Sequence, residues 1–346
     1  MLEQRTQKYM LPVGYDSRPA TLADLEAAVA LFNACSRELI GVENKYNAKD
    51  TSMEWREPGF DLERDTRLVI GPGGQLVAYI EVWNPDEPYI LPICWGRVYP
   101  AVTGLGIGTH LLQWAEERAR ANIPKAPPTA RVALRTFTLS DAREAAALFQ
   151  KAGFKHIRYF FRMVTDLAGV PLSPEWPGGI SVRTFQAGED DRAVVRAARD
   201  SFQDHWGYFE HSFEEELARW QHRIHTDPDF DATLWFLAMD DGQVAGVSLC
   251  RPKVSDDPDM GWVQTLGVRR PWRKQGLGLA LLRHSFSEFS HRGMRRVGLA
   301  VDAQNLTGAL RLYEKAGMRS DPSRQFSLYE KELRPGVDLT VEYLNV

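Results

Sequence analysis

An internal repeat constrains this chain of 346 residues more than any other feature of its sequence. Four pairs of landmarks recur at similar separations of 165, 168, 170 and 164 residues: Arg18 and Arg183, Gly74 and Gly242, Gly106 and Gly276, Gly153 and Gly317. An extra loop in the first half, Ile123 to Pro128, accounts for the drop in the last separation. Self-similarity at a nearly fixed spacing indicates one fold used twice.

The two halves also share an order of expected elements. An amphipathic helix comes first, and in the first half Leu22, Leu25, Val29 and Phe32 have its spacing. A hairpin follows at 68–82 and again at 234–249. A glycine-rich loop and an alanine-rich helix that ends in glycine complete each half. This order predicts an α/β fold (an α+β mixed sheet) in two tandem domains, each a twisted mixed β-sheet flanked by helices.

The proline-rich segment 168–179 is the expected linker, which gives domains at 1–167 and 180–346. Hydrophobic residues make up 44% and charged residues 25% of the chain, as in globular proteins. No apolar run approaches the roughly 20 residues that cross a bilayer. The stretch 1–12 also lacks the apolar core of a signal peptide.

Three widely spaced cysteines, Cys35, Cys94 and Cys250, favour neither a disulfide framework nor a metal site, and we expect a cytoplasmic protein. The formal charge of −4 argues against a nucleic-acid partner. His222 and His225 share a helix face without a third ligand, so no metal is expected.

The second half contains a loop suited to an anion. An extended run, 262–268, precedes Pro271, and Arg273-Lys-Gln-Gly-Leu-Gly278 then opens a leucine-rich helix. Glycines and a helix N-terminus present backbone amides to phosphate, and Arg273 and Lys274 add positive charge. The loop lacks the third glycine of a dinucleotide fingerprint and the Gly-Lys-Ser/Thr of a Walker loop. A glycine turn that only joins strand to helix is the structural alternative.

Two ordered motifs resemble the GNAT superfamily of N-acetyltransferases. Its cofactor signature, Gln/Arg-x-x-Gly-x-Gly/Ala, is met by Arg273 to Gly278. The family then has a strand, an Asn and a helix with Leu-Tyr-Glu-Lys-x-Gly-Phe, which here are 297–302, Asn305 and Leu312-Tyr-Glu-Lys-Ala-Gly-Met318. The similarity covers roughly 15–165 and 180–335. With His205-Trp206-Gly207 early in the second half, the tandem arrangement is similar to the mycothiol synthase-like branch.

The resemblance implies direct attack of an amine on acetyl-CoA, without a covalent enzyme intermediate. Backbone N–H groups near the end of the strand 263–268 would polarise the thioester carbonyl. Tyr313 would protonate the departing thiolate, and Asn305 would hydrogen-bond the pantetheine arm. The implied cofactor-binding residues are Leu266, Gly267, Val268, Arg273, Lys274, Gln275, Gly276, Leu277, Gly278, Leu279 and Asn305.

Two roles stay open at this point. Tyr313 shares an apolar helical stripe with Ala309, Leu310 and Ala316, so a buried core aromatic is its alternative interpretation. The general base is unassigned, because Gln264 and Thr265 stand in the strand where many GNAT proteins carry a Glu. The candidates are a water relay, Asp204, His205, Glu210, Asp257 and Asp259. An ordinary packed side chain is the more usual interpretation of His205.

The first half retains the loop glycines but lacks the arginine and the tyrosine of the second half. Thr103 replaces the arginine, and Phe149 replaces the tyrosine. Phenylalanine cannot donate a proton, so this half is expected to be non-catalytic and to bind CoA weakly or not at all. Weaker cofactor-binding candidates are Val98, Thr103, Gly104, Gly106, Gly108 and Thr109.

The sequence therefore predicts an N-acetyltransferase that moves an acetyl group from acetyl-CoA to a primary amine of a small molecule. A non-enzymatic acyl-CoA-binding or regulatory protein is one alternative, and a protein N-acetyltransferase is another. The expected partner is a small-molecule amine rather than a nucleic acid or a membrane, and the chain is expected to be a monomer or a homodimer.

Overall fold

The structure is a computed structural model that describes residues 10–85, 87–305 and 308–341. The stretch 1–9, part of the segment expected to lack a signal peptide, lies outside the described residues. The chain forms two compact units. Unit 1 runs to Arg158 and includes Phe326–Leu339, and unit 2 comprises Tyr159–Gln325 with the chain from Thr340.

Unit 1 has a sheet in the spatial order β1-β2-β3-β4-β5-β12. Its strands are β1 (Asp16–Arg18), β2 (Thr66–Ile70), β3 (Leu76–Trp83), β4 (Ile93–Val98), β5 (Val132–Leu139) and part of β12 (Arg319–Arg334). Its α-helices are α2 (Leu25–Ile40), α3 (Ala48–Trp55), α4 (Leu62–Asp65), α5 (Ile107–Ala121) and α6 (Arg143–Lys151). Pairing is antiparallel except between β4 and β5, so the sheet is mixed.

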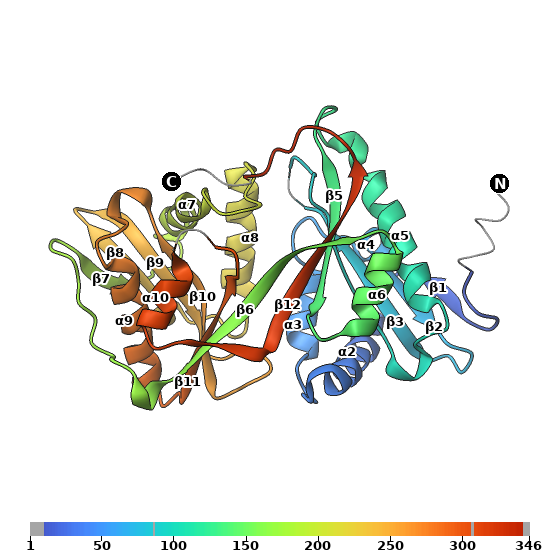
Figure 1. The fold of residues 1–346 in the computed structure, drawn as a ribbon, viewed down its shortest axis with the longest axis horizontal. Coiled ribbons are helices and arrows are strands. Elements are labelled where there is room, and N and C mark those ends of the chain that lie inside the picture. The colour runs from blue at the N-terminus through green and yellow to red at the C-terminus, as the bar shows by residue number, and fades with distance from the viewer. Residues whose placement is uncertain (1–9, 86, 306–307, 342–346) are drawn as a thin grey trace. The chain divides into compact units, whose positions relative to one another are not determined.

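Unit 2 repeats this plan in the order β6-β11-β10-β9-β8-β7 (Figure 1). Its strands are β6 (Lys155–Asp166, from Tyr159 on), β7 (Ser181–Thr184), β8 (Trp235–Asp240), β9 (Gln243–Arg251), β10 (Met260–Val268) and β11 (Arg296–Asp302). Its helices are α7 (Asp191–Phe202), α8 (Phe213–Thr226), α9 (Leu277–His291) and α10 (Ala309–Lys315). Pairing is again antiparallel except between β10 and β11. The α/β fold, with mixed β-sheet flanked by helices in each of two units, is confirmed.

Each unit takes its last strand from the other half of the sequence. Residues 326–334 of β12 pair with β5, and residues 160–166 of β6 pair with β11. Figure 1 shows these pairs as red β12 beside teal β5 and green β6 beside orange-red β11. The units therefore differ from the contiguous ranges 1–167 and 180–346 expected from the sequence. The repeat shows which segments are similar, but it does not show with which strand β6 or β12 pairs. The segment 168–179 has no α-helix or strand.

Side-chain alternation explains why helices cover both faces of the sheet in unit 2. Along β8, Phe236 and Ala238 belong to one buried cluster, whereas Leu237 belongs to another. The first cluster includes α9 side chains such as Leu281 and Phe286. The second includes side chains of α7 and α8. The sheet of unit 2 is thus buried between α9 on one face and α7 with α8 on the other.

The start of each repeat is fixed by the same ion pair. Arg18 donates to both carboxylate oxygens of Asp24 at 2.6 and 2.8 Å, and Arg183 does the same to Asp190 at 2.6 and 2.7 Å. The bidentate arginine lowers the pKa of Asp24 to about 2 and also lowers that of Asp190. The repeat inferred from spacing is therefore present at the level of individual contacts.

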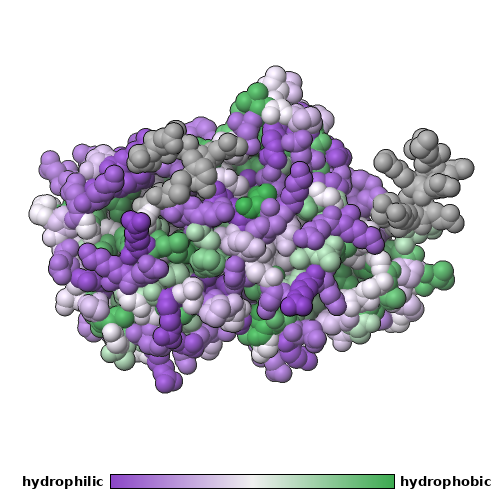
Figure 2. All heavy atoms as spheres, viewed as in Figure 1, coloured by the Kyte–Doolittle hydropathy of each residue, from purple (hydrophilic) through white to green (hydrophobic). Residues whose placement is uncertain are grey.

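In the described part of the chain, no helix is both long enough and apolar enough to cross a membrane. On the face shown in Figure 2, apolar residues are interspersed among polar ones.

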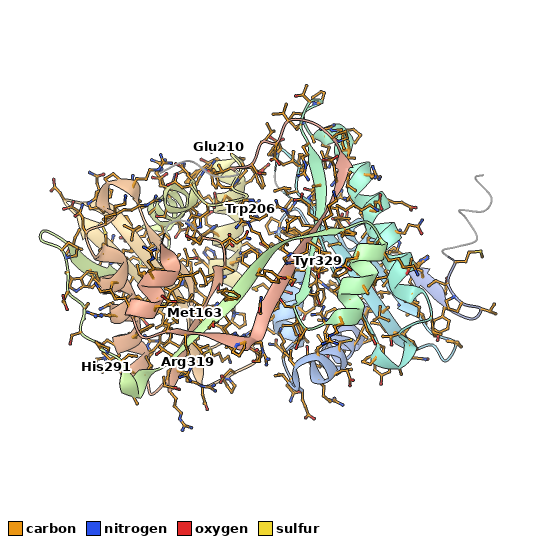
Figure 3. All side chains as sticks on the ribbon, in the orientation of Figure 1. Met163, Trp206, Glu210, His291, Arg319 and Tyr329 are labelled. Atoms are coloured by element: carbon orange, nitrogen blue, oxygen red, sulfur yellow. The ribbon has the colours of Figure 1, made fainter. Side chains whose placement is uncertain are left out.

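The exchanged strands predict a reciprocal pair of mutational effects. Tyr329 in β12 is 5% exposed and packs on Phe149 of unit 1, whereas Met163 in β6 is 2% exposed in the core of unit 2 (Figure 3). Tyr329→Ala should destabilise unit 1, and Met163→Ala should destabilise unit 2, each by about 2–5 kcal/mol. Hydrogen exchange measures this as faster exchange in β5 for the first variant and in β11 for the second. The opposite assignment would contradict the exchange of strands.

Candidate active site

The sheet of unit 2 opens between its two parallel strands. The pairing of β10 with β11 joins Met260–Trp262 to Arg296–Gly298, although β10 continues to Val268 and β11 to Asp302. On its other side β10 stays paired with β9 as far as Val268, after a shift in register between Val263 and Thr265. The end of β10 therefore has an edge without a strand partner among the described residues. Backbone N–H groups on such an edge can bind an extended ligand or a developing oxyanion.

The glycine loop joins this edge to the N-terminus of α9. Lys274 and Gly276 both have left-handed backbone conformations, with φ of 62° and 89°, and α9 begins at Leu277. The first N–H groups of a helix lack acceptors within it, so Leu277, Gly278 and Leu279 present amides at the positive end of the helix dipole. This arrangement suits a phosphate.

The glycines of the loop also have a structural function. A Cβ on Gly278 would lie 2.9 Å from Cδ1 of Leu312 on α10, so glycine allows these two helices to approach closely. In unit 1 a Cβ on Gly108 would lie 2.9 Å from Cδ2 of Leu148 on α6, and Gly106 has a φ of 86°. Since both units need glycines for their fold, the glycine pattern alone does not identify a cofactor site.

The guanidinium of Arg273 is directed into the protein. It donates to the carbonyl oxygens of Val268 and Ser201, both at 3.0 Å, and to Asp204 Oδ2 at 2.5 Å. Arg270 also binds Asp204, whose side chain is 4% exposed. Burial lowers the pKa of Arg273. Arg273 therefore joins the loop and the end of β10 to the end of α7. The other cation of the loop, Lys274, is exposed and has no ion pair among the described residues.

Tyr313 lies on α10 and is 8% exposed. Burial raises the pKa of its hydroxyl to about 12. Within the described part of the chain, this hydroxyl makes no hydrogen bond. Tyr313 thus combines the core packing expected from its helical stripe with a protonated hydroxyl that is free to act as a donor.

The other predicted cofactor residues are distributed around the loop. Leu266 and Leu279 pack at the margin of the core of unit 2, Gly267 and Leu277 are buried, and the side-chain amide of the exposed Gln275 donates to Pro271 O at 3.1 Å. Asn305 follows β11, and its backbone N–H donates to Asp302 O at 3.1 Å.

Four of the five candidate bases are engaged in other ways or are exposed. Asp204 binds two arginines, Asp257 pairs with Arg296 at 2.6 Å, and Glu210 pairs with Arg199 through a side chain that is 76% exposed. Asp259 is exposed. His205 is half-buried, and burial lowers its pKa.

His222 and His225, which were not expected to bind a metal, both lie on α8. Nδ1 of His225 lies 2.6 Å from the carbonyl oxygen of Gln221. Among the described residues, no group of three or more His, Cys, Asp or Glu side chains is arranged to hold a metal ion.

Unit 1 has the same backbone plan with different side chains. Among the described residues, β4 pairs with β5 through Ile93 and Arg135. The loop residue Thr103 donates its hydroxyl to Pro100 O at 3.0 Å. The thiol of Cys35 donates to Val98 O at 3.3 Å, where unit 2 uses Arg273. Phe149, the counterpart of Tyr313, is 9% exposed and packs on Phe154.

The chain matches the model of the acetyltransferase (GNAT) family twice, over residues 28–154 and 195–318. These two regions cover most of the chain, so the protein belongs to the GNAT acetyltransferase family. The matches fall one in each half and confirm the tandem arrangement.

Relatives and solved structures agree with this assignment. The chain is 34% identical over 222 residues to a mycothiol acetyltransferase of Thermomonospora curvata, covering 64% of this chain and 68% of the relative. It is 29% identical over 300 residues to that of Thermobispora bispora, covering 86% and 93%. A GCN5-related N-acetyltransferase from Sphaerobacter thermophilus has a TM-score of 0.76 at 35% identity, over 95% of this chain and 99% of that one.

A tandem GNAT protein from the clavulanic acid pathway shares the fold, with a TM-score of 0.70 at 19% identity over 93% of this chain and 100% of that chain. Together these matches confirm the prediction of a mycothiol synthase-like tandem GNAT protein. The chain is an acetyl-CoA-dependent N-acetyltransferase.

The contacts of Arg273 predict that it stabilises unit 2. Arg273→Ala would leave the buried Asp204 with one arginine fewer and would free two carbonyl oxygens. We expect unfolding free energy to fall by about 1–3 kcal/mol in urea denaturation. Thr103→Ala, at the same place in unit 1, removes one exposed hydroxyl contact and should change stability by less than about 0.5 kcal/mol. Equal effects of the two substitutions would contradict this role for Arg273.

Proposed function

We propose that unit 2 carries the acetyl transfer, that Tyr313 is its general acid, and that the amine attacks acetyl-CoA directly. The observation that carries this proposal is the hydroxyl of Tyr313, which has no hydrogen-bond partner among the described residues although the residue as a whole is only 8% exposed. Phe149 occupies the matching place in unit 1 with almost the same burial, so the fold needs an aromatic ring there but not a hydroxyl.

The loop and the open edge of β10 would hold the cofactor. The amides of Leu277, Gly278 and Leu279 at the start of α9 suit the pyrophosphate, and Lys274 adds a mobile positive charge. The pantetheine arm would extend along the edge of β10 that β11 leaves unpaired, and Asn305 would hydrogen-bond it. The N–H groups of Leu266 and Val268 on that edge would polarise the thioester carbonyl.

The chemistry then needs one proton to reach sulfur. As the amine nitrogen bonds to the carbonyl carbon, the carbon–sulfur bond breaks, and Tyr313 supplies its phenolic proton to the thiolate. Removal from water would raise the proton affinity of the departing thiolate, which would favour transfer of the proton from Tyr313.

For unit 1 we propose a non-catalytic role with weak or absent CoA binding. Thr103 supplies no positive charge and Phe149 no proton. The backbone of Val98, Gly104, Gly106, Gly108 and Thr109 retains the loop. All three glycines nevertheless have a structural reason, because Gly104 and Gly106 have positive φ and Gly108 allows close packing of α6.

The acceptor is proposed to be a small amine of the type used by mycothiol acetyltransferases, since several relatives carry that name. We also propose a cytoplasmic enzyme, monomeric or homodimeric, without a nucleic-acid or membrane partner. The cytoplasmic location is supported by three buried cysteines with free thiols, which persist in a reducing compartment.

The function of Tyr313 is tested by Tyr313→Phe, with Phe149→Tyr as the matched control in unit 1. Acetyl-CoA turnover is measured against a panel of primary amines that includes amino sugars and amino acid esters. We expect kcat to fall about 100-fold or more in Tyr313→Phe, with CoA affinity unchanged, and to stay at the wild-type value in Phe149→Tyr. Full activity of Tyr313→Phe would contradict the acid role. The absence of wild-type transfer to any amine would contradict the proposed acceptor class.

The function of Lys274 is tested by Lys274→Gln. Because its side chain is exposed and without an ion pair in the described structure, we expect unchanged stability and a CoA dissociation constant raised about tenfold, measured by calorimetry at low salt. The difference should shrink at high salt, where the charge is screened. An unchanged dissociation constant at low salt would show that the loop binds phosphate without this lysine.

A further inference from the structure

We infer that His205 is the general base that takes a proton from the attacking amine. This inference rests on the proposed function of unit 2. His205 lies three residues beyond the end of α7, in the segment that leads to α8, in which Figure 3 labels the next residue, Trp206. Its ring packs on Phe202 with centroids 4.6 Å apart, and its charged form interacts with Arg273 and Asp302.

His205 directly follows Asp204, which Arg273 binds, so His205 lies beside the loop at the end of β10. Arg273 belongs to the loop that follows β10, and Asp302 ends β11, so both lie where the two parallel strands have separated. Phe202, on which the imidazole packs, also lies close to the end of β10, since a Cβ on Gly267 would lie 3.5 Å from its ring. The imidazole is therefore adjacent to the strand edge where the thioester is proposed to bind.

The position of His205 is fixed by the residue before it. Asp204 is held by Arg270 and Arg273, and Arg273 also binds the carbonyl oxygen of Ser201. The backbone N–H of His205 donates to Phe202 O at 2.9 Å. The same arginine that fixes the loop thus fixes the segment that carries the imidazole.

The surroundings of the ring keep it neutral. Burial and the guanidinium of Arg273 both disfavour the imidazolium, whereas the carboxylate of Asp302 favours it. The neighbouring carboxylate of Asp204 is neutralised by two arginines. The net effect lowers the pKa of His205 below its ordinary 6.5, so the imidazole can accept a proton at neutral pH. No hydrogen bond occupies either ring nitrogen among the described residues.

Unit 1 provides an internal control. Aligning Gly41 with Gly207, which both have left-handed backbones, aligns Leu39 with His205. Leu39 is 42% exposed and cannot accept a proton. The unit that lacks the proposed acid, with Phe149 at that position, therefore also lacks the proposed base.

The proton balance is complete with these two groups. The amine loses one proton to the imidazole as the carbon–nitrogen bond forms, and sulfur gains one from Tyr313 as the carbon–sulfur bond breaks. The products are the amide and CoA with a free thiol. The imidazolium and tyrosinate return to their starting forms by losing and gaining one proton through solvent.

The test compares His205→Gln with His284→Gln. His284 lies in α9 of the same unit, packs on Phe236, and also has a pKa lowered by burial, so it is a matched control. The pH profile of kcat/KM is measured with acetyl-CoA and the panel amine that wild type acetylates fastest. The dissociation constant of CoA is measured by calorimetry for each protein.

We expect wild type and His284→Gln to lose activity as pH falls through a value below 6.5, because the imidazole becomes protonated. His205→Gln should lose at least about 100-fold in kcat/KM at neutral pH and should lack this acidic limb, with CoA binding within twofold of wild type. A retained acidic limb in His205→Gln, or near-wild-type activity, would overturn the inference while leaving transfer by Tyr313 intact. Absence of transfer by wild type to every amine would instead overturn the proposed function and, with it, the need for a base.

Discussion

The buried carboxylate of Asp204 and the two arginines it binds connect the parts on which the candidate site depends. Through Arg273 the carboxylate is linked to the carbonyl of Val268, at the last residue of β10, and to Ser201 in α7. The Asp204 carboxylate is 4% exposed, so loss of its arginine partners would leave a buried charge uncompensated. One interaction therefore fixes the cofactor loop, the end of the open strand and the segment that carries His205.

Burial shifts the pKa values of Tyr313 and His205 in opposite directions. Burial raises the pKa of Tyr313 to about 12 and lowers that of His205, because in each case it disfavours the charged form. A tyrosine that stays protonated and a histidine that stays neutral are what an acid and a base must be at the same pH. Desolvation thus prepares both groups for the proposed reaction without a carboxylate in β10, where Gln264 and Thr265 stand.

The sequence was sufficient to predict the fold, the repeat and the loop, because glycine spacing and apolar periodicity are local properties of the chain. It also identified Tyr313 as a candidate. It did not predict that Arg273 is directed at Asp204, since sequence spacing does not show the direction of a side chain. Nor did it predict the exchanged strands, because 160–166 and 326–334 read as ordinary strands and their partners are set only by tertiary pairing. For His205 the sequence favoured a packed residue, and its packing against Phe202 agrees with that interpretation.

Comparison of the two units distinguishes residues that the fold requires from residues that we propose for the reaction. Both units keep a left-handed glycine before α5 or α9 (Gly106 and Gly276) and a glycine that packs against α6 or α10 (Gly108 and Gly278). Both also keep the bidentate Arg–Asp pair at the start of the repeat. Unit 1 has nevertheless replaced Arg273, Tyr313 and His205 by Thr103, Phe149 and Leu39. The shared residues hold the backbone in place. Of the three residues peculiar to unit 2, Arg273 also holds the backbone, and only Tyr313 and His205 have the proton-transfer roles that we propose. Each unit also takes a strand from the other half of the sequence, so neither half of the sequence supplies a complete unit by itself.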